Sequence, residues 1–343
     1  MYIVKKLKFI YNRYCIIQTY IFIILMDYIC KNDTIIFGPK YNEQIDVNLL
    51  SQYKKVIFSN YKLDECLFDK FESNNLENIV YMPSHFNQPV DNLPNTLTHL
   101  TFGNGFNQLV DNLPNTLTHL TFAKKFNQPV DNLPKTLTHL IFGIYFNQPI
   151  DNLPNTLTYL TFSNYFNQPV NNLSNTLIHL TFGQSFNQPV NNLPNTLTHL
   201  SFGCNFDQEL NNLPNSLTHL TLGYKYDKRV DLSSNIKYLK LDCNNQYLID
   251  NLPNGIEELE FGEFFNLELN NLPSSIKKII FDKYNKYNKE LNCLPNFVEL
   301  IQLPMYYDKK ILKIPKELKK VIYHKKYKFK KDFKKLNRET YFY

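Results

Sequence analysis

The sequence predicts a mainly β protein, a solenoid in which each coil of about twenty residues adds one short parallel strand. A block of this length is repeated, nearly unchanged, over residues 86–223 of the 343-residue chain. Within each block, apolar and polar residues alternate over a short stretch, as in a strand with one buried face. Prolines interrupt the rest of the block and disfavour a long helix. The seven regular copies begin at Phe86, Phe106, Phe126, Phe146, Phe166, Phe186 and Phe206.

The strand of each coil is predicted around the motif Leu-x-x-Leu-x-Phe, which the first copy contains at residues 97–102. Leu100 and Phe102 fall on one face of this strand, and His99 and Thr101 fall on the other. The second half of each coil carries asparagine, aspartate and proline. We expect it to form a turn, with at most one 3₁₀ turn, and then an extended run to the next strand. The side opposite the sheet is therefore expected to be irregular.

Weaker copies of the same template extend the predicted solenoid to residues 34–323. Prolines recur downstream in the place that Pro94 has in the first regular copy. The fifteen predicted strands end at residues 37, 58, 81, 102, 122, 142, 162, 182, 202, 222, 241, 261, 281, 303 and 323.

Residues 1–33 are predicted to form an N-terminal hydrophobic segment or cap. Residues 14–30 are apolar and follow basic residues, but the stretch is short for a membrane span. It also contains Gln18 and Asp27 and lacks a small-residue cleavage site. A hydrophobic helix that covers the open first coil is one interpretation, and a signal anchor is the other. Translation from Met26 would remove most of the segment.

Residues 324–343 are predicted to form a basic, aromatic C-terminal tail. The tail has eight Lys or Arg residues against two acidic residues, so it accounts for the whole net charge of +6. Basic residues interleaved with aromatic ones can bind RNA or an anionic membrane. Nucleic acid or membrane binding is therefore expected only through this tail. The alternative is a solvated or partly helical cap on the last coil.

The motif Phe-Asn-Gln-Pro, followed by Leu-Pro-Asn-Thr-Leu-Thr-His-Leu-Thr-Phe-Gly, resembles the FNIP repeats of social amoebae and of giant viruses that infect amoebae. The resemblance covers at least residues 86–223, and in weaker form residues 37–323. FNIP repeats are similar to leucine-rich repeats, so the resemblance implies a leucine-rich-repeat-like solenoid. The asparagine of a leucine-rich repeat would fall at Gly105, whereas this chain has Asn107. The turn geometry is therefore expected to differ.

Members of this family often carry an F-box before the repeats, which would imply a substrate adaptor of a ubiquitin ligase. Residues 1–52 contain no recognisable F-box. The resemblance therefore implies a non-catalytic interaction protein of the cytoplasm, or of the host cytoplasm if the source is viral. An adaptor with a diverged N-terminal docking segment is the alternative.

One outward position of the strand carries histidine in most copies, and threonines flank it. Stacked strands would bring these rings about 4.8 Å apart. A metal site, a purely structural stack of neutral imidazoles and a face for a protein partner are the three interpretations. The column lacks carboxylates and offers no closed four-ligand geometry. Crowding of like charges is expected to lower the pKa of these histidines, so that mild acid loosens the central coils. The candidate partner-binding residues are Thr98, His99, Thr101, Thr118, His119, Thr121, Thr138, His139, Tyr159, Thr161, His179, Thr181, His199, His219 and Thr221.

Asparagine recurs at two other positions, in columns that begin at Asn87 and Asn92. Side-chain amides at turns can bond to backbone groups that no strand satisfies. We therefore expect both columns to be structural.

The downstream coils carry charges of alternating sign at the position of Thr98. These residues are Lys237, Glu257, Lys277, Glu299 and Lys319. Lys240 and Glu260 are expected to face each other one column over. Opposite charges on neighbouring strands attract, so we expect Glu257 to attract both Lys237 and Lys277. The pattern supports the predicted register.

No motif in the sequence predicts catalysis or a bound cofactor. The patterns G-x-S-x-G, P-loop and G-x-G-x-x-G are missing. The six cysteines follow no metal or disulfide spacing and are expected to be small apolar residues in a reducing compartment. We therefore expect a monomeric, non-catalytic repeat scaffold without metal or cofactor. It would bind an unknown protein partner, a host protein if the source is viral, through the exposed sheet.

Overall fold

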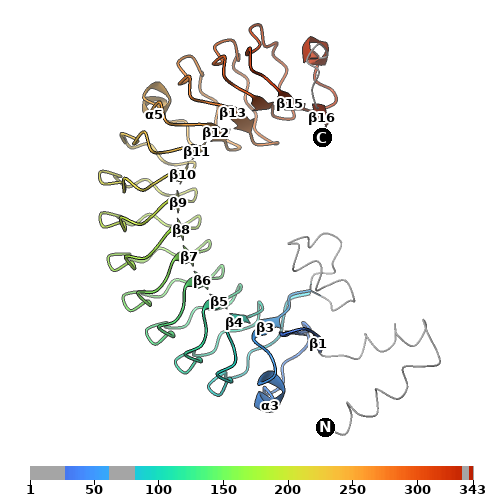
Figure 1. Ribbon diagram of the computed structural model, residues 1–343, viewed down its shortest axis with the longest axis vertical. Coiled ribbons are helices and arrows are strands. Elements are labelled where there is room, and N and C mark those ends of the chain that lie inside the picture. The colour runs from blue at the N-terminus through green and yellow to red at the C-terminus, as the bar shows by residue number, and fades with distance from the viewer. Residues whose placement is uncertain (1–27, 62–81, 334–339, 343) are drawn as a thin grey trace, which may run out of the picture. The chain divides into compact units, whose positions relative to one another are not determined.

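The computed structural model describes residues 28–61, 82–333 and 340–342, and the chain divides into two compact units, Met1–Gln128 and Pro129–Tyr343. Each unit is built from coils that contribute one short strand each, and the coils stack in sequence order (Figure 1). The protein is a mainly β, parallel-strand solenoid with very little helix, as predicted. No helix in the described part of the chain is long and apolar enough to cross a membrane.

The described residues of the first unit form five strands and one short helix. Four of the strands are parallel, and Ile35, Val56, Leu100 and Leu120 lie side by side across them. The helix begins after Asp46, whose carboxylate accepts hydrogen bonds from two backbone N–H groups of the first turn. The elements are β1 (Tyr28–Lys31), β2 (Thr34–Phe37), α3 (Val47–Leu50), β3 (Lys55–Phe58), β4 (His99–Thr101) and β5 (His119–Thr121).

The end of the predicted hydrophobic segment is a strand rather than part of a helix. Strand β1 pairs antiparallel with β2 through a turn in which Asn32 has a φ of 53°. Asparagine tolerates this left-handed conformation better than most residues. The edge of β2 would otherwise leave N–H and C=O groups unpaired, and β1 satisfies them. Residues 1–27, on which the rest of the prediction falls, lie outside the described residues.

The predicted strand that ends at Tyr81 also lies outside the described residues. Its neighbours in sequence, β3 and β4, pair directly with each other. The ring of Phe86 lies 3.8 Å from that of Phe58, much as Phe106 lies 3.7 Å from Phe102 in the next coil. Phe86 therefore completes the coil that begins with β3.

The second unit continues the same pattern through eleven strands in its described residues. Register is kept throughout, so that Leu200, Leu220, Leu239 and Leu259 lie side by side on the buried face. The strands are β6 (His139–Ile141), β7 (Tyr159–Thr161), β8 (His179–Thr181), β9 (His199–Ser201), β10 (His219–Leu222), β11 (Tyr238–Leu241), β12 (Glu258–Phe261), β13 (Lys278–Phe281), β14 (Leu300–Gln302), β15 (Lys320–Tyr323) and β16 (Thr340–Phe342). A short helix α5 (Gln246–Asp250) and a 3₁₀ turn η1 (Lys330–Phe333) complete the unit.

Columns of leucine and phenylalanine form the core. The ring of Phe162 lies 3.8 Å from Phe166 in its own coil and 5.6 Å from Phe182 in the next coil. These rings are fully buried, and each contributes about 1.5–3 kcal/mol on burial. Because one face of each ring is covered only by the neighbouring coil, the coils stabilise one another.

The turn side carries no long helix in the described residues, and its two asparagine columns differ in their hydrogen-bond partners. In the column of Asn87, the side-chain Oδ1 accepts a hydrogen bond from the backbone N–H of Asn107 at 2.8 Å. In the column of Asn92, by contrast, Asn112 and Asn152 donate to aspartate carboxylates. The expected backbone bonding therefore holds for the first column, whereas these two members of the exposed second column have side-chain partners.

The solenoid extends beyond the predicted boundary at residue 323. Strand β16 pairs with β15, and Tyr327 and Phe333 are buried with their rings 6.1 Å apart. Tyr327 also continues the column of core rings, 6.1 Å from Tyr307. The sequence analysis assigned Tyr327 and Phe333 to a C-terminal tail because lysines surround them, but their aromatic rings cover the last coil.

Candidate functional site

All fifteen residues of the predicted binding face lie on the outward side of a strand or directly before it, and all are partly exposed. The two units carry separate parts of this face. In the second unit, Thr161, Thr181, Ser201 and Thr221 form a continuous column across β7 to β10. Ser201 joins the column because it aligns with Thr181 and Thr221, although it is not among the predicted residues.

The histidine rings stack closely. In the first unit, the ring centres of His99 and His119 lie 4.1 Å apart. In the second unit, His179, His199 and His219 stack at 4.0 Å from one ring to the next. The spacing is shorter than the distance expected between strands. The stack is a row of flat polar groups.

Threonine hydroxyls hold the imidazoles in place. The Oγ1 atom of Thr198 lies 2.7 Å from Nδ1 of His199 and donates to the carbonyl oxygen of Ile178 at 3.3 Å. Thr218 makes the same pair of contacts, at 2.9 Å to His219 and 3.2 Å to the Thr198 carbonyl. A hydroxyl has one proton, so when it goes to the carbonyl, Oγ1 accepts from Nδ1–H. The neutral ring then presents Nε2 outward as an acceptor.

Burial lowers the pKa of three histidines in the second unit. For His139 burial is the cause, and for His179 burial is joined by repulsion from His219 and His139. For His199 the pKa falls to about 4, first because of burial and then because of repulsion from His219 and His179. The pKa is therefore lowered in the expected direction for these three, but burial is the first cause, and like-charge crowding contributes only at His179 and His199. These imidazoles are neutral at pH 7.

The stacked rings do not converge on a common point. Near-parallel imidazoles send their in-plane lone pairs in the same direction, whereas a bound metal needs ligands that point inward. The described residues include no group of three or more His, Cys, Asp or Glu side chains that could hold a metal ion.

Ion pairs cover the outward face beyond β10. Glu257 pairs with Lys277 at 2.7 Å, and Glu258 pairs with Lys278 at 2.7 Å. Lys240 pairs with Glu260, as expected. Of the two lysines expected beside Glu257, Lys277 forms the ion pair, whereas the Nζ atom of Lys237 donates to the Gly255 carbonyl. The register of strands β11, β12 and β13 agrees with the predicted register.

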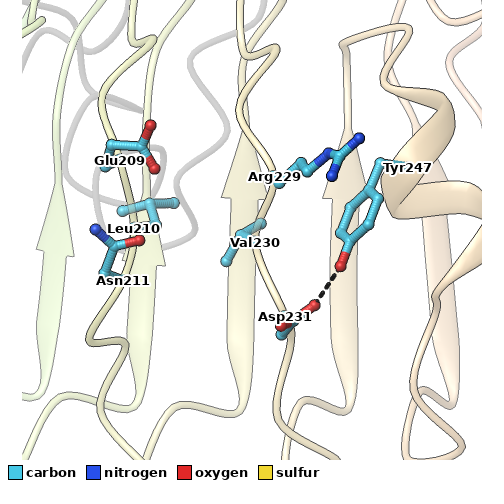
Figure 2. A pocket seen from close by; sticks show the side chains of 7 residues that line it. All are labelled: Glu209, Leu210, Asn211, Arg229, Val230, Asp231 and Tyr247. Atoms are coloured by element: carbon cyan, nitrogen blue, oxygen red, sulfur yellow. Dashed lines mark hydrogen bonds between the residues drawn. The ribbon is translucent and has the colours of Figure 1, made fainter.

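A pocket on the turn side is a feature that the sequence interpretation missed. Glu209 and Arg229 occupy the place that proline has in most regular coils. Tyr247 of α5 donates a hydrogen bond to Asp231 at 2.6 Å, and its ring centre lies 5.3 Å from the guanidinium carbon of Arg229. Figure 2 shows these side chains around an open pocket of about 350 Å³. The loss of proline in two successive coils was the signal that could have revealed it.

The chain is similar to known repeat proteins in sequence and in structure. The FNIP Repeat model matches residues 86–125, 126–165, 166–205, 189–225 and 226–264, together more than half of the chain. CroV588, a circular leucine-rich-repeat protein from a giant virus, has a sequence 38% identical to this chain, and its crystal structure superposes with a TM-score of 0.65. That match covers 85% of this chain and 43% of CroV588.

YopM from Yersinia enterocolitica is 20% identical, with a TM-score of 0.47 and coverage of 83% of this chain and 68% of YopM. A search of the curated proteins finds no match.

Proposed function

The chain belongs to the FNIP repeat family, and from this premise we propose that it is a non-catalytic scaffold that binds a protein partner on the exposed face of its parallel sheet. Solenoids of the leucine-rich-repeat type generally serve as interaction scaffolds. We infer a monomer that acts in the cytoplasm, or in the host cytoplasm if the source is viral.

The uncharged outward face of β6 to β10 is the observation that supports this proposal. Its strand positions carry histidine, tyrosine, threonine, serine and isoleucine, and none of them is charged. Hydrogen bonds between threonine and histidine, such as Thr218 with His219, hold the side chains before any partner arrives. A preordered surface loses little side-chain entropy on binding, which favours affinity.

The same face limits the chemistry of the partner. Neutral imidazoles and hydroxyls can donate and accept hydrogen bonds, but they attract no charged group over a distance. Recognition would therefore rest on shape and on short hydrogen bonds. Beyond β10, the ion pairs of Glu257 and Glu258 already satisfy their lysine neighbours.

Charge placed on this face tests the proposal. The double variant Thr181→Arg/Thr221→Arg adds two cations to the column, while Asn172→Arg/Asn192→Arg adds the same charge to exposed positions on the turn side. Tagged chains would be crosslinked in native cells and their partners quantified by mass spectrometry. We expect a protein captured by the wild type to be lost from the sheet variant and kept by the turn variant.

Retention of every partner by the sheet variant would contradict the proposal, as would equal loss from both variants. Recovery of Skp-type and cullin subunits with both variants would favour the ubiquitin-ligase adaptor instead.

A further inference from the structure

Large aromatic side chains gather at one exposed turn of the second unit. The turn follows the strand and is closed by a backbone hydrogen bond, such as Phe265 N–H to the Gly262 carbonyl at 3.3 Å or Tyr307 N–H to the Pro304 carbonyl at 3.1 Å. The third residue of this turn is aromatic on three consecutive coils. These residues, here called the aromatic row, are Phe264, Tyr284 and Tyr306, which are 49%, 56% and 67% exposed.

The fold itself does not require these rings. The same turn position carries Ser185 and Asn205 in regular coils whose backbone hydrogen bonds are the same. An exposed ring leaves apolar surface in water, and a contiguous row of such rings marks an interaction site. Tyr224, one residue earlier in its turn, extends the row, since its ring lies 4.8 Å from that of Phe264.

The coils that carry the aromatic row are rich in lysine. Residues 262–333 contain sixteen lysines and eight acidic residues, a net charge of +8. The Nζ atom of Lys283 lies 5.5 Å from the ring centre of Tyr284. Lys286 is exposed nearby, and Lys326 takes the position of the row in the following coil. The surface thus combines flat rings with positive charge.

Two acidic residues lie beside the row, and the lysines of residues 262–333 outnumber all the acidic residues there. Asp282 uses one carboxylate oxygen to accept the backbone N–H of Tyr284 at 2.7 Å, which fixes the turn. Glu263 precedes Phe264 on an exposed surface.

We propose that the aromatic row and its flanking lysines bind single-stranded nucleic acid. Unpaired bases offer flat faces that stack on aromatic rings, and the phosphates attract lysine. Tyr284 and Tyr306 contact no other ring in the described part of the chain, and both residues are more than half exposed, so a base can reach them. An acidic protein would satisfy the lysines but would not use the rings in this way.

This site is distinct from the binding face on the sheet and does not depend on it. It also differs from the binding that the sequence predicted only for residues 324–343, because the rings belong to earlier coils of the solenoid.

A second aromatic pair provides a matched control. Tyr145 and Tyr165 occupy the same turn position, with exposures of 43% and 53%, but their rings stack on each other at 5.4 Å. Residues 129–205 around them contain one lysine and two aspartates. This pair has the rings without the positive charge, so it should not bind nucleic acid.

Fluorescence anisotropy of labelled 20-nucleotide oligouridylate and oligothymidylate, with the full chain at about 50 mM salt, tests the proposal. We expect the wild type to bind and Tyr284→Ala/Tyr306→Ala to lose about tenfold or more in affinity per ring. Tyr145→Ala/Tyr165→Ala should bind within about twofold of the wild type, and Tyr284→Phe/Tyr306→Phe should keep affinity because the rings remain. Lys283→Gln/Lys286→Gln should weaken binding and reduce its salt dependence.

Stronger binding to one oligonucleotide would identify RNA or DNA as the preferred ligand, and either supports the proposal. The proposal fails if neither oligonucleotide binds, if the alanine variant binds like the wild type, or if the control pair loses as much. It also fails if only phosphatidylserine vesicles bind, since the occupant would then be an anionic membrane. Circular dichroism of each variant shows whether it is folded.

Discussion

The Oδ1 atom of Asn147 accepts a hydrogen bond from the backbone N–H of Asn167, the equivalent residue one coil later, at 2.9 Å. Asn167 accepts from the N–H of Asn187 in the same way, at 2.9 Å. The side chain of Gln168 reaches back to the Asn147 carbonyl at 3.1 Å. The turn side has no strand ladder at this point, so these side chains satisfy backbone groups that would otherwise lack partners. This row of side-chain hydrogen bonds explains why asparagine and glutamine follow phenylalanine in the copies that begin at residues 86 to 186.

Removal of one of these hydrogen bonds should weaken the solenoid. Asn167→Ala leaves the partly buried N–H of Asn187 without its acceptor, and we expect the free energy of unfolding to fall by about 1–3 kcal/mol. Asn167→Asp keeps an acceptor oxygen, just as Asp207 accepts from the N–H of Asp227 at 3.0 Å, and should cost much less. Urea denaturation followed by circular dichroism measures both variants. Equal midpoints for Asn167→Ala and the wild type would show that water satisfies the N–H group instead.

The regular coils could be predicted because their packing and their sequence pattern have the same period. Leu100 and Phe102 are fully buried, and His99 and Thr101 are partly exposed, as their alternation indicates. Repetition makes the register visible, since every column contains the same type of residue. The outward face of the candidate site followed directly from this register.

The ends of the solenoid and the side-chain partners could not be predicted in the same way. The apolar residues of β1 fit a helix or a strand equally well, and only the open edge of β2 decides between them. Alignment of the coil sequences places Glu257 between two lysines, but it does not show the side-chain conformations, and in the structure Glu257 pairs with Lys277. The pocket beside Arg229 depends on α5, which interrupts the repeat.

Buried tyrosine hydroxyls without partners should lower stability. The Tyr226 hydroxyl is buried and has no hydrogen-bond partner among the described residues, and the preceding coil carries Phe206 in the same column. We expect Tyr226→Phe to raise the free energy of unfolding by about 1 kcal/mol, because an unpaired polar group leaves the core. Tyr327 provides the contrast, since its hydroxyl donates to the Lys309 carbonyl at 2.7 Å. Tyr327→Phe should therefore lower the free energy of unfolding by about 0.5–1.5 kcal/mol.

Thermal melting monitored by circular dichroism compares the two substitutions. A lower midpoint for Tyr226→Phe would indicate that a buried water binds the hydroxyl.

The histidine stack should make the second unit sensitive to mild acid. The pKa of His199 is lowered to about 4, first by burial and then by its charged neighbours. An unfolded histidine titrates near 6.5, so the unfolded chain binds more protons than the folded chain between these two values. The free energy of unfolding therefore falls as the pH drops from about 6.5 to about 4, and it changes no further below that range on account of His199.

His199→Gln should make this loss shallower, since one group no longer titrates. Urea midpoints at several pH values measure the loss, and NMR titration of the histidine Hε1 signals measures the pKa directly. A pKa near 6.5 for His199 would contradict the prediction.

Charge reversal should distinguish the true partner of Glu257 from its other neighbour. Glu257→Lys replaces the ion pair with Lys277 by repulsion and leaves three lysines in a row, so we expect stability to fall. The contact holds the pKa of Glu257 below its ordinary value, through the hydrogen bond and charge of Lys277. Adding Lys277→Glu should restore more stability than adding Lys237→Glu, because the Lys237 ammonium group contacts the Gly255 carbonyl. Both side chains of the pair are exposed, so the effect should shrink as salt is added. Thermal midpoints of the two double variants at low and high salt decide the question, and equal rescue by both lysines would mean that Glu257 is shared between them.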